Sequence, residues 1–199
     1  ERCVLRGRFG FMAFHGGALE AMTDVVAERA AELAEASYYG VLHPADQPHF
    51  PSIEVDPAHS PVLAGFLAHV TVVIAVHGFG REGMYTSLLL GGRNRELAEH
   101  VAGELSIGLP EYMMHTDLET IPAELRGLHA RNPVNLPPHA GVQIELPPRV
   151  RGASPIWQDW HGPGYVPHTM RLIEGLAAAA RSWPQGASRS TTQISPDRR

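Results

Sequence analysis

The sequence has one cysteine, no long apolar run and no cluster of basic residues, and each shortage excludes a class of protein. Cys3 is the only cysteine of the chain, so an internal disulfide is excluded and disulfides give no indication of the compartment. No apolar run approaches the roughly 20 residues that a membrane-spanning helix needs. The net charge of −5 at pH 7, without a stripe rich in Lys and Arg, does not suit the neutralisation of phosphates. We therefore expect a soluble protein whose partners include neither nucleic acid nor a membrane.

The length and composition fit one globular domain. The 199 residues are enough to bury a hydrophobic core, and contents of 44% hydrophobic and 19% charged residues are ordinary for such a domain. We expect a single domain over residues 1–183 and a polar, disordered tail over residues 184–199. The chain begins at Glu1 without a methionine, so N-terminal processing and either a cytoplasmic or a secreted location are left open. The sequence does not indicate the oligomeric state.

Short apolar runs alternate with segments of helical periodicity along the chain. The runs predict strands over residues 9–14, 38–42, 70–76, 85–90, 112–115 and 142–146. The periodic segments predict helices over residues 23–36, 61–68, 96–105 and 166–183. Thr23 is the expected N-cap of the first helix, and Val26, Ala30 and Leu33 form its expected buried face. This alternation is typical of a single-domain α/β fold with a mostly parallel, mixed open sheet and helices on both faces.

Two histidines each close an apolar run and are followed by glycine. His15 ends the first run and His77 ends the third, and both runs are expected to be buried parallel strands. The two imidazoles would then emerge at the carboxyl edge of the sheet, with Glu20 close by. Two histidines and a carboxylate form the three-ligand set of a catalytic zinc site. Taken singly, each histidine is more often a hydrogen-bonded structural group, and Glu20 is equally explained as a solvated acid near a helix start.

The segment 43–61 holds five prolines and is expected to be a loop. Its three histidines, His43, His49 and His59, are expected at the surface, which is the usual position of histidine in such a loop.

The strand predicted near residues 141–146 carries two polar residues in alternation with apolar ones. Val142, Ile144 and Leu146 share one face, and Gln143 and Glu145 share the other. In an edge strand the polar pair would face water, whereas in a central strand it would be costly unless it lined a site. Near the carboxyl end of a central strand, Glu145 could take a proton from water and give it to a leaving amine. The sequence leaves both interpretations open.

Five motifs follow one another along the chain: His15-Gly-Gly-Ala-Leu-Glu20, Val76-His77-Gly78, Leu90-Gly-Gly92, Asn132-Pro-Val-Asn135 and Gly141-Val-Gln-Ile-Glu-Leu146. In this order they make the chain similar, over residues 9–151, to the poly-γ-glutamate hydrolase family. The resemblance implies a phage-derived or bacterial type of zinc peptidase. It also implies a fold similar to that of the zinc carboxypeptidases.

The resemblance assigns roles to particular residues. His15, Glu20 and His77 match the zinc ligands of the family, and Glu145 matches its catalytic glutamate. The implied cofactor is Zn²⁺, and the implied reaction is hydrolysis of amide bonds by zinc-activated water, with Glu145 as general base and acid. The implied substrate is a small acidic peptide or a γ-glutamyl polymer.

Such a reaction also calls for a cation that stabilises the oxyanion, and arginine suits both this task and the binding of a substrate carboxylate. The candidates are Arg93, Arg131, Arg149 and Arg151. We favour Arg93 because it comes just after a strand end. Arg93, Asn132 and Asn135 are predicted to bind substrate, although asparagine beside proline is first of all turn chemistry.

Two positions depart from the family pattern and leave the substrate open. Leu136 follows Asn135 where the family usually has arginine, and Arg93-Asn94 stands where an aliphatic residue and an aspartate are expected. Two alternatives therefore remain beside γ-glutamyl hydrolysis. One is a zinc amidase or deacylase that acts on N-acyl amino acids or cell-wall peptides. The other is a non-catalytic binding protein that kept the fold.

Overall fold

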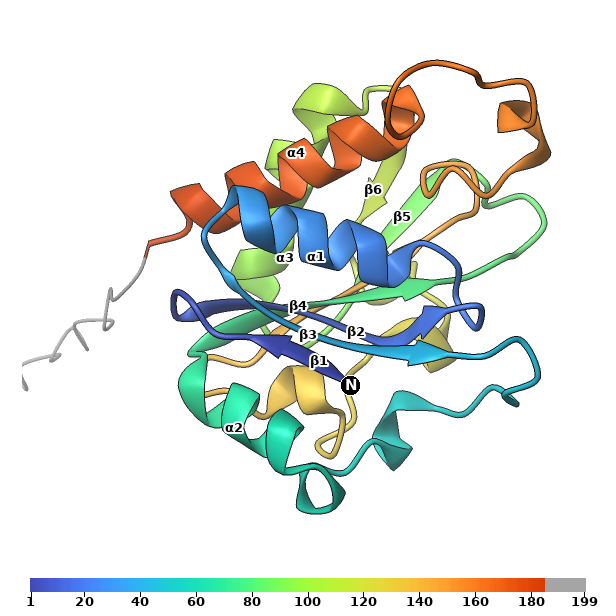
Figure 1. Ribbon diagram of the computed structural model, residues 1–199. Coiled ribbons are helices and arrows are strands. Elements are labelled where there is room, and N and C mark those ends of the chain that lie inside the picture. The colour runs from blue at the N-terminus through green and yellow to red at the C-terminus, as the bar shows by residue number, and fades with distance from the viewer. Residues whose placement is uncertain (185–199) are drawn as a thin grey trace, which may run out of the picture.

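The computed structural model describes residues 1–184, so the predicted tail lies, beyond Pro184, outside the described residues. Seven strands and four α-helices form this part of the chain (Figure 1). The strands are β1 (Arg2–Val4), β2 (Phe9–Gly17), β3 (Ser37–His43), β4 (Val72–Gly78), β5 (Ser87–Leu90), β6 (Met113–His115) and β7 (Gly141–Leu146). The α-helices are α1 (Thr23–Leu33), α2 (Pro61–His69), α3 (Arg95–Gly108) and α4 (Pro167–Ser182). Within residues 1–184, no helix is both long and apolar enough to cross a membrane.

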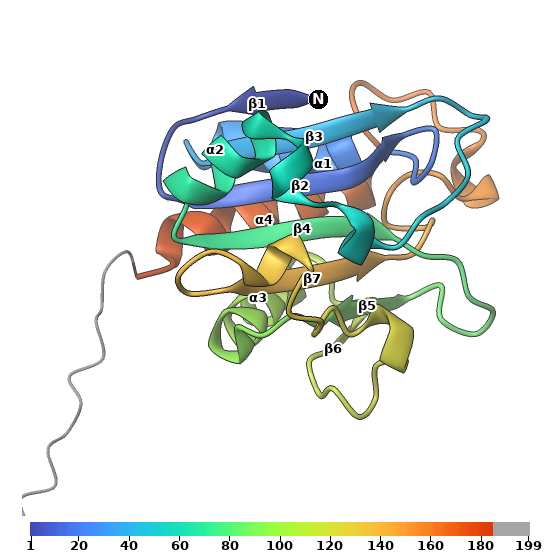
Figure 2. The ribbon, with the colours of Figure 1, turned by 90° about the horizontal axis from the view of Figure 1, so that it is seen from below.

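The strands form one sheet in the order β1-β3-β2-β4-β7-β5-β6. β3, β2, β4 and β7 are parallel to one another, whereas β1 runs antiparallel to β3 and β5 runs antiparallel to β7. Figure 2 shows the arrowheads of β2, β3, β4 and β7 toward one edge of the sheet, with β5 pointing the opposite way. The prediction of a mostly parallel, mixed open α/β sheet is confirmed. β7 lies between β4 and β5, so it is a central strand.

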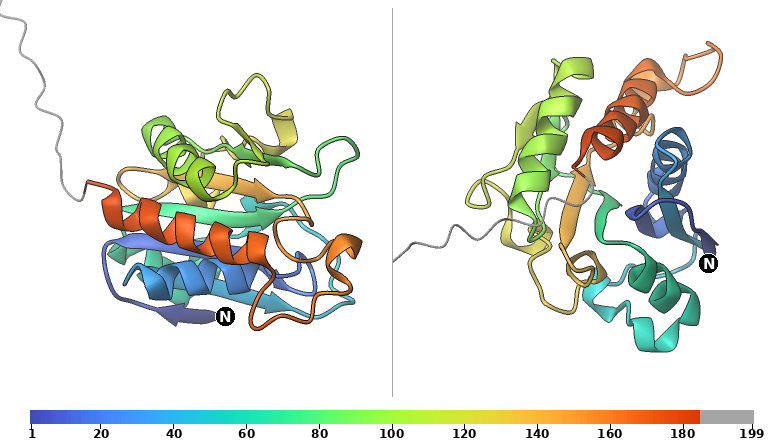
Figure 3. Two further views of the ribbon diagram at one scale, coloured as in Figure 1. Left: turned by 90° about the horizontal axis from the view of Figure 1, so that it is seen from above. Right: turned by 90° about the vertical axis from the view of Figure 1, so that its left-hand side faces the viewer.

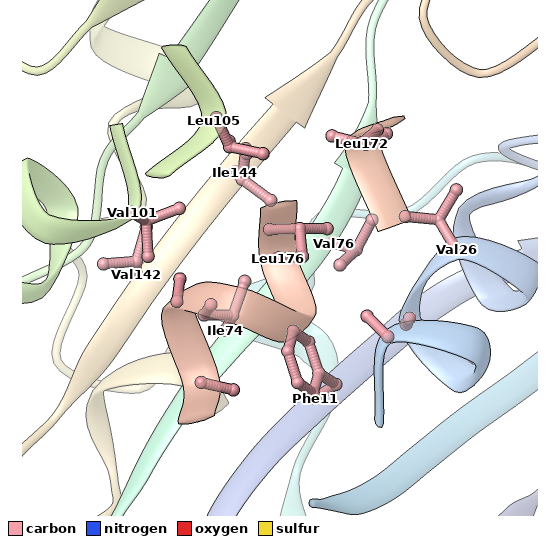
Figure 4. Packing of buried hydrophobic residues seen from close by; sticks show 14 of the residues in the cluster. Phe11, Val26, Ile74, Val76, Val101, Leu105, Val142, Ile144, Leu172 and Leu176 are labelled. Carbon is pink, nitrogen blue, oxygen red and sulfur yellow. The ribbon is translucent and has the colours of Figure 1, made fainter. Parts of the chain in front are cut away.

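Three helices cover one face of the sheet, and one helix covers the other. α1, α3 and α4 lie across the first face (Figure 3) and bury a large apolar cluster against it. Ile74 of β4, Ile144 of β7 and Leu176 of α4 meet in this cluster (Figure 4). On the opposite face, Leu63 and Phe66 of α2 pack into a second apolar cluster. Because both faces are covered, the central strands are apolar almost throughout, which is why their sequences appear as continuous apolar runs.

The start of α1 differs from its prediction. Thr23 is the first helical residue, and the N-cap is Met22, which adopts the left-handed conformation with φ of 74°. The hydroxyl of Thr23 donates a hydrogen bond to the carbonyl oxygen of Glu20 (2.8 Å), so it closes the preceding turn instead of capping the helix. Leu33, expected on the buried face, is exposed, and α1 ends at this residue.

Candidate metal centre

His15 and His77 lie together at the carboxyl edge of the sheet. They stand near the ends of β2 and β4, which pair in parallel, and their ring centroids are 5.1 Å apart. Both side chains are buried. The turn after β2 brings Glu20 back to them, because the backbone N–H of Glu20 donates a hydrogen bond to the carbonyl oxygen of His15 (2.7 Å). The predicted convergence of these three side chains is therefore what the structure contains.

The carboxylate of Glu20 lies between the two imidazoles. Its Oε1 is 2.7 Å from Nδ1 of His15, and its Oε2 is 3.5 Å from Nδ1 of His77. The backbone N–H of Gly78 donates a further hydrogen bond to Oε2 (2.8 Å). Burial alone would raise the pKa of Glu20, but the hydrogen bonds with the two histidines outweigh it and lower the pKa well below its ordinary value. Glu20 is thus a fixed negative charge at neutral pH.

These residues fit a zinc ion. Each histidine directs Nδ1 at the carboxylate, while Nε2 of His15 and Nε2 of His77 are buried without a hydrogen-bond partner among the described residues. Nδ1 of each histidine is therefore the nitrogen that could share an ion with Glu20, because the two Nδ1 atoms and the carboxylate oxygens converge on one place. Burial also lowers the pKa of His15, which favours the neutral imidazole that a metal requires. Two imidazoles and one carboxylate are a donor set that zinc accepts.

A third imidazole, that of His49, contacts the same carboxylate. Its Nε2 lies 3.3 Å from Oε1 of Glu20, and its ring centroid is 4.9 Å from that of His15. The donor atoms of His15, Glu20 and His49 lie within 4.8 Å of one another, so this trio is also a possible metal-binding group. The sequence interpretation placed His49 at the surface, and its side chain is indeed 60% exposed. The sequence interpretation did not predict the contact with Glu20. The contact arises because this loop follows β3, whose carboxyl end lies beside that of β2.

Glu145 stands directly beside His77, because β7 pairs with β4 in a register that aligns the two residues. Its side chain is buried, and Nε2 of Gln143 donates a hydrogen bond to its Oε1 (2.8 Å). Burial raises the pKa of Glu145 to about 7, and neighbouring His77 limits the rise. The pair Gln143 and Glu145 therefore occupies a central strand and lines a site, which decides between the two interpretations that the sequence left open.

A cavity of about 670 Å³ opens above these residues. His15, His77, Gln143 and Glu145 line it from the sheet, and Glu20 lines it from the turn after β2. One wall comes from the loop after β3, which folds back beneath the sheet toward α2 (Figure 1) and contributes His49 and residues 51–53. The other wall is the segment 123–129, together with Asn132. The candidate base and the candidate ligands thus share one solvent-open space.

Comparison with known proteins identifies the family of the chain. A sequence model of the family described as poly-gamma-glutamate hydrolase matches residues 2–154. The chain belongs to this family. Because the family is one of hydrolases, the chain is a hydrolase. No curated protein sequence matches it.

Solved structures share the fold of this hydrolase. The structure of a bacteriophage poly-gamma-glutamate hydrolase superposes with a TM-score of 0.70 at 18% identity, covering 89% of this chain and 86% of that one. A structure described as YNDL-apo, zinc-free, has a TM-score of 0.70 at 19% identity, with 91% and 89% covered. The Agrobacterium tumefaciens gene product Atu2144 has a TM-score of 0.51 at 14% identity, with 88% and 90% covered. At such identities the likeness establishes the fold alone.

None of the four arginines proposed from the sequence lines the cavity of this hydrolase. Arg93 is exposed and donates a hydrogen bond from Nε to the carbonyl oxygen of Leu128 (3.0 Å), so it braces the wall from which Leu128 faces the cavity. Arg131 is exposed. The guanidinium of Arg149 lies over the ring of Tyr112, 5.9 Å from its centroid. The structure thus places Arg93 outside the cavity lining, because a loop distant in sequence takes up its side chain.

Arg151, the fourth candidate, is buried behind the centre. Its Nε donates to the carbonyl oxygen of Leu146 (3.0 Å), at the end of β7, and its Nη1 donates to that of Ala21 (2.5 Å), just after Glu20. A Cβ atom at Gly78 would lie 2.7 Å from Cζ of Arg151, so a larger residue there would have to displace the guanidinium from this position. Arg151 thus joins the three segments that carry Glu145, Glu20 and His77.

The two predicted asparagines differ in position. Asn132 is buried, lines the cavity, and donates a hydrogen bond from Nδ2 to Oε1 of Gln143 (2.8 Å). Asn135 is not among the cavity-lining residues. Its Oδ1 accepts from the backbone N–H of Arg93 (3.1 Å), and its Nδ2 donates to the carbonyl oxygens of Gly127 and His129. Asn135 therefore holds one wall of the cavity in place.

Proposed function

We propose that this hydrolase is a zinc-dependent amide hydrolase acting on γ-glutamyl linkages, with His15, Glu20 and His77 as ligands and Glu145 as general base and acid. The observation that carries the proposal is the alignment of buried Glu145 with His77 on adjacent strands. Membership of the poly-gamma-glutamate hydrolase family supports the substrate class.

The chain supplies the ligands from rigid parts of the fold. His15 and His77 belong to paired strands, and Glu20 is held by a backbone hydrogen bond to His15 and by the N–H of Gly78. Zinc bound there would lower the pKa of a coordinated water and polarise the carbonyl group of the substrate. His77, rather than exposed His49, is the third ligand in this proposal because its side chain is buried on a strand.

Glu145 has the properties of a group that moves a proton at neutral pH. A pKa of about 7 keeps both its protonation states populated, which suits a residue that first accepts a proton and later donates it. The hydrogen bond from Gln143, itself held by Asn132, fixes the carboxyl group in one orientation. Glu145 can thus take a proton from the attacking water and pass it to the leaving amine.

The substrate contacts of the proposal differ from those predicted by the sequence. Of the three predicted substrate-binding residues, Asn132 alone lines the cavity, while Arg93 and Asn135 support its wall. Among the described residues that line the cavity, Arg126 is the single arginine. Its side chain is 26% exposed, so it is the group we assign to the carboxylate of a glutamyl unit.

Metal analysis and one substitution test this function. Purified protein should contain near-stoichiometric zinc, and H15A and H77A should lose it. E145Q should retain zinc while kcat/KM on γ-glutamyl oligomers falls by about 10²–10⁴-fold, the range of general acid–base catalysis. A zinc-free wild-type protein, or an E145Q variant with unchanged turnover, would reject the proposal.

A second activity has a specific observation in its favour. The walls of the cavity include Pro51, Ile53, Leu125 and Leu128 beside the single Arg126. Such a lining suits an apolar acyl group as well as a polyanion, and favours a zinc amidase or deacylase acting on N-acyl amino acids or cell-wall peptides. Relative kcat/KM on γ-linked and α-linked glutamate oligomers, N-acyl amino acids and peptidoglycan fragments decides between the two activities.

A further inference from the structure

The proposed reaction assigns no role to His49, although its imidazole lies beside the candidate metal ligands Glu20 and His15. Its Nε2 is 3.3 Å from Oε1 of Glu20, and its ring lies against that of His15. The side chain is 60% exposed and lines the same cavity as Glu145. His49 is therefore in contact with the metal-binding carboxylate and at the same time open to a substrate.

Aromatic packing holds His49 in this place. The ring of Phe50 meets that of His15 edge-on at 4.9 Å and that of His43 at 5.3 Å. His43 is anchored in turn, because its Nε2 lies 2.8 Å from the carbonyl oxygen of Phe14 in β2. A proline precedes His49 and another follows Phe50, and each fixes its own backbone φ. The loop thus presents His49 from a fixed position.

The environment favours a substrate contact over a fourth metal ligand. Catalytic zinc sites use three protein ligands and keep one position for water or substrate, and His15, Glu20 and His77 already supply three. The four arginines suggested by the sequence are absent from the lining of the cavity. Arg126, the arginine present there, donates Nε to the carbonyl oxygen of Ile121. His49 is then the exposed N–H donor in contact with the centre.

We propose, on the basis of the proposed function, that His49 is a catalytic residue that donates a hydrogen bond to the scissile carbonyl oxygen. When substrate enters, the N–H at Nε2 would exchange its contact with Glu20 for one with this oxygen, which gains negative charge as water attacks. The proton stays on Nε2, so the step needs no acid or base beyond Glu145. Removing one such donor typically costs about 10²–10³ in kcat.

Zinc affinity distinguishes a donor from a ligand. In competition with a chelator, H49A should lose no more than the roughly 10–100-fold that removal of a contact to a ligand costs, whereas H77A should lose more than about 100-fold, because a ligand itself is removed. H59A is the matched control, because His59 is an exposed histidine of the same loop that does not line the cavity. A loss in H49A equal to that in H77A makes His49 a ligand and overturns the proposal.

A small anion tests the donor without any glutamyl group. Acetohydroxamate should bind zinc-loaded H49A at least about tenfold more weakly than wild type, the value of a hydrogen bond to a charged group. H49Q, which keeps an N–H donor at a similar distance from the backbone, should recover most of the affinity, and H59A should match wild type. Equal affinity in H49A and wild type overturns the proposal.

Turnover completes the test and separates the two proposals. On a substrate that is cleaved, H49A should lower kcat by about 10²–10³ and leave KM within about threefold. Failure to cleave γ-glutamyl bonds rejects the proposed substrate, while the hydroxamate measurement still decides the role of His49. Wild-type protein without zinc overturns both proposals, and unchanged hydroxamate binding by H49A overturns this one alone.

Discussion

Glu20 and Glu145 are both buried near His77, yet their pKa values move in opposite directions. Burial raises the pKa of each carboxyl group, but Glu20 lies in hydrogen-bonding contact with two imidazoles and stays ionised. Glu145 receives one hydrogen bond, from the neutral amide of Gln143, so burial dominates and its pKa reaches about 7. Two carboxylates with separated pKa values are the usual sign that one has a fixed charge and the other transfers protons. This difference supports the proposed roles of Glu20 as ligand and Glu145 as base, independently of any sequence motif.

The raised pKa of Glu145 predicts a pH-dependent stability in metal-free protein. A carboxyl group whose folded pKa lies above its unfolded value of 4.5 stabilises the fold below that value and loses this contribution as pH rises toward 7. The stability that E145Q gains relative to wild type should therefore grow between pH 5 and 8, by up to about 3 kcal/mol. Urea unfolding of both metal-free proteins measures it, and a constant difference across this range would contradict the raised pKa.

At the level of elements, the site depends on contacts that hold the end of β7, the end of β4 and the turn after β2 together. Arg151 donates to the carbonyl oxygens of Leu146 and Ala21 and lies against Gly78, so one side chain crosses the ends of β7, β4 and the turn after β2. It makes no ion pair with a carboxylate among the described residues. Its hydrogen bonds to carbonyl oxygens thus fix positions of the backbone, and we assign it a positioning role.

Loss of this guanidinium should weaken both the fold and metal binding. R151M removes the donor of the Ala21 carbonyl oxygen and one of the two donors of the Leu146 carbonyl oxygen, which keeps the backbone N–H of Phe79 (3.1 Å). It should lower the free energy of unfolding by about 1–3 kcal/mol. Zinc affinity should fall by about 10–100-fold, and R151K should recover only part of it because a single ammonium cannot reproduce the fork. Arg149 offers a control, since R149M removes a neighbouring arginine that lies over Tyr112. Zinc affinity in R151M equal to that in R149M would contradict the positioning role.

Substitution of Gly78, which lies against Arg151, should also lower zinc affinity. An added Cβ would lie 2.7 Å from Cζ of Arg151, so G78A must displace the guanidinium or shift β4. We expect G78A to lose zinc affinity as R151M does, and the double variant to lose little more than either alone, because both changes disrupt one contact. Additive losses, measured by chelator competition, would show that Gly78 acts independently of Arg151.

Elements and strand-end residues could be predicted from the sequence, whereas contacts made by long loops could not. His15, His77 and Glu145 follow from strand periodicity and parallel pairing, which local patterns encode. His49 and Arg93 depend on how residues 44–60 and 117–138 fold back over the edge, and no local periodicity specifies that. The N-cap of α1 was mispredicted for a related reason, since Thr23 hydrogen-bonds to the turn that carries Glu20 instead of to its helix.

For the whole molecule, the apolar clusters and the polar edge are separate. One face of the sheet is covered by α1, α3 and α4, and the other by α2. The candidate ligands and base lie instead toward the carboxyl edge of the sheet: His15, Glu20, His77 and Glu145. Burial of that many apolar side chains, each worth about 1.5–3 kcal/mol, does not depend on a bound ion. The fold should therefore persist when the metal is removed.

Metal removal is expected to increase local opening only at the carboxyl edge of the sheet and in the loop beside it. After chelation, far-UV circular dichroism should be unchanged, and hydrogen exchange should increase at residues 15–20 and 44–60 but not in the interior of β4 or β7. Global loss of protection on chelation would show that the ion is required for folding. The zinc-depleted H77A variant should reproduce the exchange pattern of chelated wild type.

The division of the cavity between sheet and loops has a practical consequence. The proposed ligands and base lie on strands and on the turn after β2, and His49 stands at the start of one wall. The rest of both walls, residues 51–53 and 123–129, consists of loop and short 3-10 turns that contribute little to the packed layers. Exchanging these two segments for those of a relative would change which acyl or peptide group is accepted without rebuilding the reaction centre. The protein is in this respect a scaffold for redesign, in which substrate choice can be altered by grafting while the bond-breaking machinery is left intact.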